Sequence, residues 1–209
     1  MRLFKPNQKD HWERVYKKHA STEVGWYQAY PALSLKLISD AGVGSDVSMI
    51  DIGGGTSKLA GYLLDLGYKQ ITVLDLSKNA IEKAKIQLGE KSGRINWIEA
   101  NVTKYSFTEQ YDIWHDRAVF HFLTEAADRK GYINSLDQAL RVNGHLIIST
   151  FSLDAPPKCS GLPVVRYSPE SLKNELGDHY TLIESLYEDH VTPSGIKQNF
   201  IFCRFIKRF

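Results

Sequence analysis

Three consecutive glycines directly after a short apolar segment set narrow limits on what this chain can form. The apolar segment is Val47–Ile52, the glycines are Gly53, Gly54 and Gly55, and helical periodicity follows at Thr56–Leu66. Glycine lets the chain turn sharply and brings backbone N–H groups close to a ligand that a Cβ would exclude. At the end of a first parallel strand this pattern predicts a nucleotide-type ligand, and the alternative is a glycine-rich turn that binds nothing.

The glycine spacing argues against a dinucleotide cofactor. A dinucleotide-binding loop reads Gly-x-Gly-x-x-Gly, and counting from Gly53 and Gly55 the third position is Lys58. A second strand candidate ends at Asp75 and Leu76. An acidic side chain there is typical of an acceptor for two vicinal ribose hydroxyls, so Asp75 is a candidate ribose contact. Leu76, the next residue, is also a candidate cofactor contact. The alternative for Asp75 is a cap for the next helix.

Short apolar runs alternate with helical patterns along most of the chain. Parallel strands need a returning helix between them, so this alternation predicts an α/β fold. The last segment differs, because the β-like runs Tyr180–Val191 and Ile196–Phe205 are joined only by a turn. We therefore expect the sheet to end in an antiparallel hairpin. The other expected strands are Val47–Ile52, Ile71–Leu76, Ile95–Glu99, Tyr111–Trp114 and His145–Phe151, and the other expected helices are Gln8–His19, Ala32–Ala41, Asn79–Leu88 and Arg129–Leu140.

Four residues mark expected helix boundaries. Ser77 and Asp128 are plausible N-caps, and Gly67 and Gly89 are plausible C-terminal stops.

The length of 209 residues favours a single domain, residues 1–209, because one hydrophobic core organises about 150–250 residues. We expect residues 47–209 to form the sheet core and residues 1–46 to form a helical appendage. The irregular stretch Ser152–Tyr167 contains three prolines and is a candidate functional loop.

Composition excludes several kinds of partner. Lys and Arg number 26 and Asp and Glu number 24, which leaves a net charge of +2, so nucleic acid is not expected as a partner. No apolar run approaches the roughly 20 residues that cross a bilayer, and we expect a cytoplasmic protein without membrane contact. The only cysteines, Cys159 and Cys203, offer neither a disulfide scaffold nor a metal site.

The run from Asp51 to Ser57, together with Asp75 and the final hairpin, resembles the class I S-adenosylmethionine-dependent methyltransferases. The resemblance implies a Rossmann-like seven-stranded sheet in the order 3-2-1-4-5-7-6, with strand seven antiparallel and helices on both faces. It implies S-adenosylmethionine (SAM) as cofactor and S-adenosylhomocysteine (SAH) as product, with Asp51 and the three glycines among the cofactor contacts. The third glycine of the family loop is replaced by Ser57.

The resemblance also assigns the adenine site. The family places an acidic residue after strand three, and Asn101 occupies that position here. Its amide oxygen is expected to accept a hydrogen bond from the adenine amine, and Val102 is expected to lie against the ring. No metal is expected.

The fourth strand runs into His115-Asp116-Arg117, which resembles the Asp-Arg-Gly of thiopurine methyltransferase and the Asp-Lys-Gly of some lysine methyltransferases. The resemblance implies that His115 and Asp116 face the methionine part of the cofactor and the acceptor, which makes them the candidate catalytic residues. His115 and Arg117 are candidate cofactor contacts. The alternatives are an ion pair between Asp116 and Arg117, and a core position for His121.

The amino-terminal region is rich in aromatic rings, including Trp12 and Trp26. It resembles the opening of thiopurine methyltransferase and of elongation-factor lysine methyltransferases, where this part folds over the cofactor. We expect residues 1–28 to form a lid with both tryptophans near the cofactor, because aromatic faces suit a sulfonium cation. The alternative is that these rings only anchor the appendage to the sheet.

These features predict a methyltransferase whose acceptor is unidentified, with a slight preference for a small molecule. The alternatives are a protein lysine methyltransferase and an inactive SAM-binding module. Cys159 is either an acceptor contact or a small buried residue.

Overall fold

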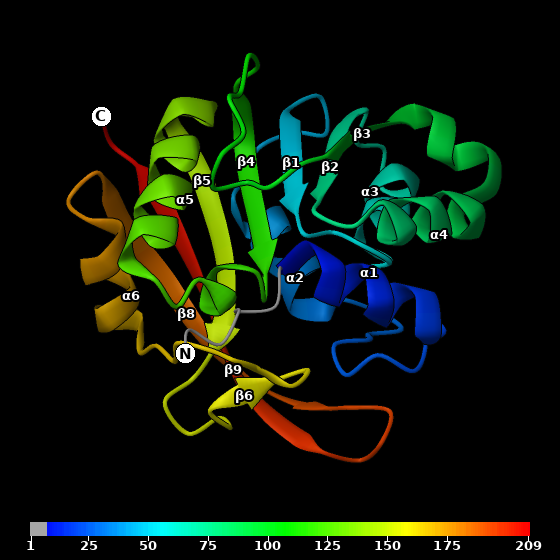
Figure 1. Ribbon diagram of the computed structural model, residues 1–209. Helices are drawn as coiled ribbons and strands as arrows, with labels where there is room; N and C mark the ends of the chain where they lie inside the picture. Colours follow the sequence, from blue (N-terminus) through cyan, green and yellow to red (C-terminus); the bar gives the residue numbers. More distant parts are fainter. Residues whose placement is uncertain (1–7) are drawn as a thin grey trace.

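Seven strands form one mixed sheet in the computed structural model, which describes residues 8–209 (Figure 1). The strand order is β3-β2-β1-β4-β5-β9-β8, in which β1 to β5 are parallel and β9 is antiparallel to both neighbours. This order confirms the expected 3-2-1-4-5-7-6, because a small extra hairpin, β6 and β7, shifts the later numbers. The strands are β1 Ser48–Ile52, β2 Gln70–Asp75, β3 Ile95–Glu99, β4 Tyr111–Arg117, β5 Leu140–Phe151, β6 Lys158–Cys159, β7 Leu162–Pro163, β8 Tyr180–Val191 and β9 Lys197–Lys207.

Helices cover both faces of the sheet (Figure 1). One buried core joins the sheet to α5 and α6, and a second joins it to α2 and α3. Successive side chains of a strand point to opposite faces, so Ile113 of β4 enters the second core and Trp114 enters the first. The helices are α1 Gln8–Lys18, α2 Ala32–Asp40, α3 Leu59–Asp65, α4 Lys78–Leu88, α5 Ala126–Ala139 and α6 Pro169–Leu176, with 3-10 turns η1 Gly89–Arg94 and η2 Phe120–Phe122.

Two helix starts differ from expectation. α3 begins at Leu59, because the Ser57 hydroxyl accepts a hydrogen bond from the Leu59 backbone nitrogen at 3.1 Å and keeps the preceding residues in the loop. α5 begins at Ala126 with Glu125 in the N-cap position, so Asp128 is not the cap. It lies in the first turn instead, where a carboxylate interacts favourably with the helix dipole.

Other expected boundaries are confirmed. The Ser77 hydroxyl accepts a hydrogen bond from Ala80 at the start of α4, and Gly89 ends that helix with φ of 57°. The final hairpin turns at Thr192, whose backbone nitrogen donates to the Ile196 carbonyl oxygen at 2.9 Å. The stretch expected to be an irregular loop folds partly into the β6–β7 hairpin.

The amino-terminal segment lies across the carboxyl ends of the parallel strands (Figure 1). The Glu13 carboxylate of α1 accepts hydrogen bonds from the Lys78 and Asn79 backbone nitrogens at 2.7 and 3.1 Å, at the start of α4. Farther along, the Gly25 carbonyl oxygen lies 2.8 Å from Nε2 of His190 on β8. Residues 1–7 of the predicted lid lie outside the described residues. No helix within residues 8–209 is long and apolar enough to cross a membrane.

Candidate active site

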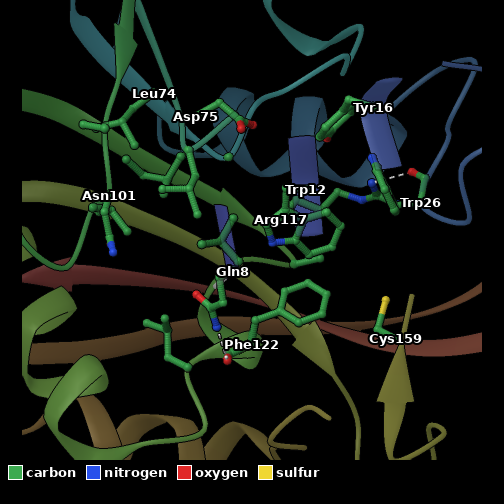
Figure 2. A pocket seen from close by; sticks show the side chains of 18 of the residues that line it. Gln8, Trp12, Tyr16, Trp26, Leu74, Asp75, Asn101, Arg117, Phe122 and Cys159 are labelled. Atoms are coloured by element: carbon green, nitrogen blue, oxygen red, sulfur yellow. Dashed lines mark hydrogen bonds between the residues drawn. The ribbon is translucent and has the colours of Figure 1, made fainter. Parts of the chain in front are cut away.

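A cavity lies at the carboxyl ends of β1, β2 and β4, beside α1 (Figure 2). Its empty volume is about 840 Å³, including the part open to solvent. Eight of the predicted cofactor contacts line it: Trp12, Trp26, Gly53, Asp75, Leu76, Asn101, Val102 and Arg117. Five predicted site residues are not part of its wall: Asp51, Gly54, Gly55, His115 and Asp116.

The glycine loop is packed tightly on all sides. Gly53 has φ of 62°, and a Cβ there would overlap Cγ2 of Val119 in the loop after β4. Gly55 has φ of 46°, and its Cβ would lie 2.5 Å from the Tyr16 hydroxyl oxygen. The glycines therefore let the amino-terminal helix and the β4 loop close over the end of β1, and only Gly53 reaches the cavity.

Asp75 lies between the start of α4 and the cavity. Its Oδ1 accepts a hydrogen bond from the Ser77 backbone nitrogen at 2.8 Å, and its side chain also lines the cavity (Figure 2). Burial raises the pKa of Asp75 to about 7, and the nearby negative charges of Asp51 and Glu13 act in the same direction. The carboxyl group therefore changes charge near neutral pH.

Asn101 and Val102 line the same end of the cavity. The structure corrects the expectation for the Asn101 amide oxygen, because Oδ1 already accepts hydrogen bonds from Thr103 N and Thr103 Oγ1, both at 2.9 Å. The group available to a ligand is the amide nitrogen, which donates. An adenine ring offers acceptor nitrogens that match such a donor.

His115 is enclosed in a buried hydrogen-bonded chain away from the cavity. Its Nδ1 lies 2.7 Å from Asp51 Oδ1, and its Nε2 lies 2.9 Å from the Ser34 hydroxyl of α2. All three side chains are buried, and β1 and β4 place Asp51 directly beside His115. The expectation that His115 and Asp51 face the cofactor is therefore corrected, since their strand positions direct both side chains under α2.

Asp116 points to the other face of the sheet. It accepts hydrogen bonds from the Tyr132 hydroxyl at 2.6 Å and from the Val119 and Phe120 backbone nitrogens at 2.8 and 3.2 Å. Burial raises the pKa of Asp116 to about 6. The side chain holds the β4 loop against α5 and is enclosed by these donors, which corrects the expectation that it faces the acceptor.

Arg117 does reach the cavity, where its Nη1 donates a hydrogen bond to the Trp26 carbonyl oxygen at 2.8 Å (Figure 2). Its guanidinium lies 5.5 Å from the centroid of the Phe200 ring. The alternative of an ion pair between Asp116 and Arg117 is not realised, because neighbouring strand residues point to opposite faces.

Aromatic rings from α1 and the segment after it cover the cavity. Trp12 packs edge-on against Trp26 at 5.5 Å and against Phe122 at 5.0 Å, and Tyr16 packs against Trp26 at 5.8 Å. Tyr16 was not among the predicted cofactor contacts, although it lies four residues after Trp12 and so shares its helix face. The sequence analysis missed Phe200, which lines the cavity and which no local pattern links to this site.

Two further residues were left open by the sequence. Cys159 lines the cavity, and burial raises the pKa of its thiol to about 11. His121 is fully buried and packs edge-on against Phe122 and Phe151. Burial lowers the pKa of His121 to about 3, so the ring is neutral, which fits the core position considered for it.

Comparison with known proteins relates this architecture to a family. A model described as a methyltransferase domain matches residues 50–148. The chain is 25% identical over 195 residues to human EEF1A lysine methyltransferase 2, covering 85% of this chain and 76% of that protein. It is 26% identical over 203 residues to malonyl-[acyl-carrier protein] O-methyltransferase 2 of Ilyobacter polytropus, covering 90% of this chain and 73% of that protein. Its match to mouse eEF1A lysine and N-terminal methyltransferase spans only 14% of that protein's length.

A solved structure shows the same fold. The Burkholderia thailandensis 1,6-didemethyltoxoflavin-N1-methyltransferase, with bound 1,6-didemethyltoxoflavin and SAH, superimposes with a TM-score of 0.70 at 18% identity, covering 97% of this chain and 84% of that chain. The sheet order with its antiparallel β9, the glycine loop and the matched methyltransferase domain agree with one another. We conclude that the chain belongs to the class I SAM-dependent methyltransferases.

Proposed function

We propose that this methyltransferase acts on a small molecule that binds beside SAM in the aromatic cavity. The observation that supports the proposal is the continuity of the cavity, which joins Asp75 and Asn101 on one side to Phe122 and Cys159 on the other (Figure 2). Phe200 also lines it. The first pair suits a nucleoside, and the second group leaves an apolar, aromatic-walled space for a flat acceptor.

In this proposal each cofactor contact has a distinct role. The Asp75 carboxylate accepts hydrogen bonds from the ribose hydroxyls, the Asn101 amide donates to a ring nitrogen of adenine, and Val102 packs against the ring. The cofactor supplies an electrophilic methyl group on a sulfonium centre. Trp12 and Trp26 cover that centre, exclude water and stabilise its positive charge with their rings.

On the side of the cavity wall proposed for the acceptor, which lies away from Asp75, none of the described residues is a general base. Burial and the charge of Asp75 raise the pKa of Tyr16, and burial raises the pKa of Cys159 to about 11, so both keep their protons at neutral pH. The chain therefore acts by alignment and enclosure, and the acceptor must carry its own nucleophilic lone pair. His115 and Asp116 are positioning residues, since they hold β1, β4 and the β4 loop in place.

The test is an acceptor panel of small thiols, amines and carboxylic acids, scored by SAH release. We expect tight SAH binding and SAH release with at least one flat small acceptor. Binding of SAH without release from any acceptor would favour an inactive SAM-binding module.

A protein lysine is the second candidate, because the similarity to human EEF1A lysine methyltransferase 2 covers 85% of this chain. Incubation of cell lysate with methyl-labelled SAM separates the two. Label in the low-molecular-weight fraction supports a small acceptor, and label retained in the protein fraction supports a protein acceptor.

A further inference from the structure

Arg117 has hydrogen-bond donors that nothing in the described chain accepts. Its Nε and Nη2 atoms are buried and have no partner within residues 8–209, whereas Nη1 donates to the Trp26 carbonyl oxygen. A buried donor without a partner is unfavourable, and more so when the group is charged. A guanidinium held in this state is therefore suited to a ligand that supplies acceptor oxygens.

Among residues 8–209, no free anion lies beside Arg117. Glu188 and Asp51 act on the charge of Arg117, but Glu188 accepts from the Gln28 amide at 3.0 and 3.1 Å, and Asp51 is bonded to His115. Even with burial lowering its pKa to about 10, Arg117 carries its full charge at neutral pH. The only other charged side chain in the cavity wall, among the described residues, is Asp75.

We propose that Arg117 binds a carboxylate of the methyl acceptor, so that the acceptor is a small, largely apolar acid; this inference rests on the proposed function. A guanidinium presents parallel N–H groups that match the two oxygens of a carboxylate. The Phe200 ring lies against the guanidinium and limits its rotation. The rest of the wall at this end is apolar, which suits the remainder of such an acid.

The placement of Arg117 favours the acceptor over the cofactor as the source of the carboxylate. Arg117 ends β4, and its neighbours Phe200 and Cys159 come from β9 and β6. Asp75 and Asn101 lie at the opposite side of the cavity, beyond β2 and β3 (Figure 2). SAM also carries a carboxylate, and the experiment must separate the two sources.

The experiment measures ligand binding by calorimetry with three chains: wild type, Arg117→Met and Arg117→Lys. The first titration uses SAH, and the second uses 5′-methylthioadenosine, which lacks the amino-acid part and its carboxylate. The third compares benzoate with benzamide, two flat probes of equal size, on the chain saturated with SAH. Lys158→Met is the matched control, since it removes an exposed positive charge next to Cys159.

We expect wild type to bind benzoate about tenfold more tightly than benzamide, the ratio for one charge-assisted contact. Arg117→Met should abolish this preference with SAH affinity unchanged, Arg117→Lys should keep part of it, and Lys158→Met should keep all of it. No preference for benzoate in wild type would overturn the inference while leaving SAH binding, and so the proposed function, intact.

A second result would also overturn it. If Arg117→Met weakens SAH about tenfold but leaves 5′-methylthioadenosine unaffected, Arg117 binds the cofactor carboxylate. Failure of wild type to bind SAH at all would refute the proposed function first. If Arg117→Met does not fold, Arg117→Lys provides the test. A reduced preference for benzoate in that chain would support the inference, and an unchanged preference would contradict it.

Discussion

The two halves of the cavity are built in different ways. The half that suits the nucleoside is formed by residues that directly follow neighbouring parallel strands, such as Gly53 after β1, Asp75 at the end of β2 and Asn101 after β3. The half that suits the acceptor joins Trp12 of α1, Arg117 of β4 and Phe200 of β9. The first is a property of strand ends, whereas the second exists only when distant segments meet.

This difference explains how one fold serves many acceptors. If the proposed sites are right, changes in the amino-terminal segment or in β9 would alter the acceptor half without disturbing the strand ends proposed to bind the nucleoside. Four substitutions test whether the two halves of the cavity are independent of each other, and the one with the strongest predicted effect comes first.

Gly53→Ala should have the largest effect, because Gly53 lies in the cavity wall and packs directly against Val119 in the loop after β4. The added Cβ would overlap Val119 and sit at a positive φ, so we expect a loss of about 2–4 kcal/mol in the free energy of unfolding. Urea denaturation measures it. Gly89→Ala is the control, because it has a similar φ of 57° with no atom within 4 Å, and it should cost only about 1–2 kcal/mol. Equal losses would mean that the close approach of Val119 is unimportant.

Asp75→Asn should weaken SAH binding by about 1.5–3 kcal/mol, the range for losing a charge-assisted hydrogen bond. With the pKa of Asp75 near 7 in the free protein, wild-type affinity should rise about tenfold between pH 6 and pH 8, because the carboxylate form is the one that binds ribose. Calorimetry across this range should show a flat profile for Asp75→Asn. Unchanged affinity in that variant would make Asp75 a cap only.

The same carboxyl group affects stability with the opposite sign. Its folded-state pKa of about 7 lies above the ordinary value of 3.8, so the folded chain binds more protons between these values. The contribution of Asp75 to stability is therefore largest below pH 4 and falls as the pH rises towards 7. Asp75→Asn should remove this slope from ligand-free unfolding curves.

Glu13→Ala should loosen the lid while leaving the strand ends intact. It removes the acceptor for three donors at the start of α4, namely Ser77 Oγ, Lys78 N and Asn79 N, so we expect a loss of about 1 kcal/mol in stability. Hydrogen exchange should increase within residues 8–18, and SAH should protect residues 8–28 in wild type. Equal protection with and without SAH would make α1 a fixed brace.

Asn101→Asp should have the smallest effect. The carboxylate keeps both hydrogen bonds from Thr103 but loses the amide donor, so we expect SAH affinity to change by less than about 1 kcal/mol. Asn101→Leu removes both functions and serves as the comparison. A tenfold loss in Asn101→Asp would show that the amide donor is essential to adenine binding.

The sequence alone determined the parts of the fold whose signals are local. The glycine loop, the Ser77 cap and the terminal hairpin each depend on residues within a few positions of one another, and all three formed as predicted. The strand order followed from the family resemblance that these motifs carry.

Which side chains face the cavity depends on the tertiary structure. His115, Asp116 and Arg117 are adjacent in sequence but have different surroundings. His115 belongs to the buried hydrogen-bonded chain under α2. Asp116 lies in the core beside α5, and Arg117 lines the cavity. Neighbouring residues of a strand point to opposite faces of the sheet, but tertiary packing determines which element covers each face. Arg117 meets Phe200 because β9 inserts next to β5, a contact that requires the folded sheet.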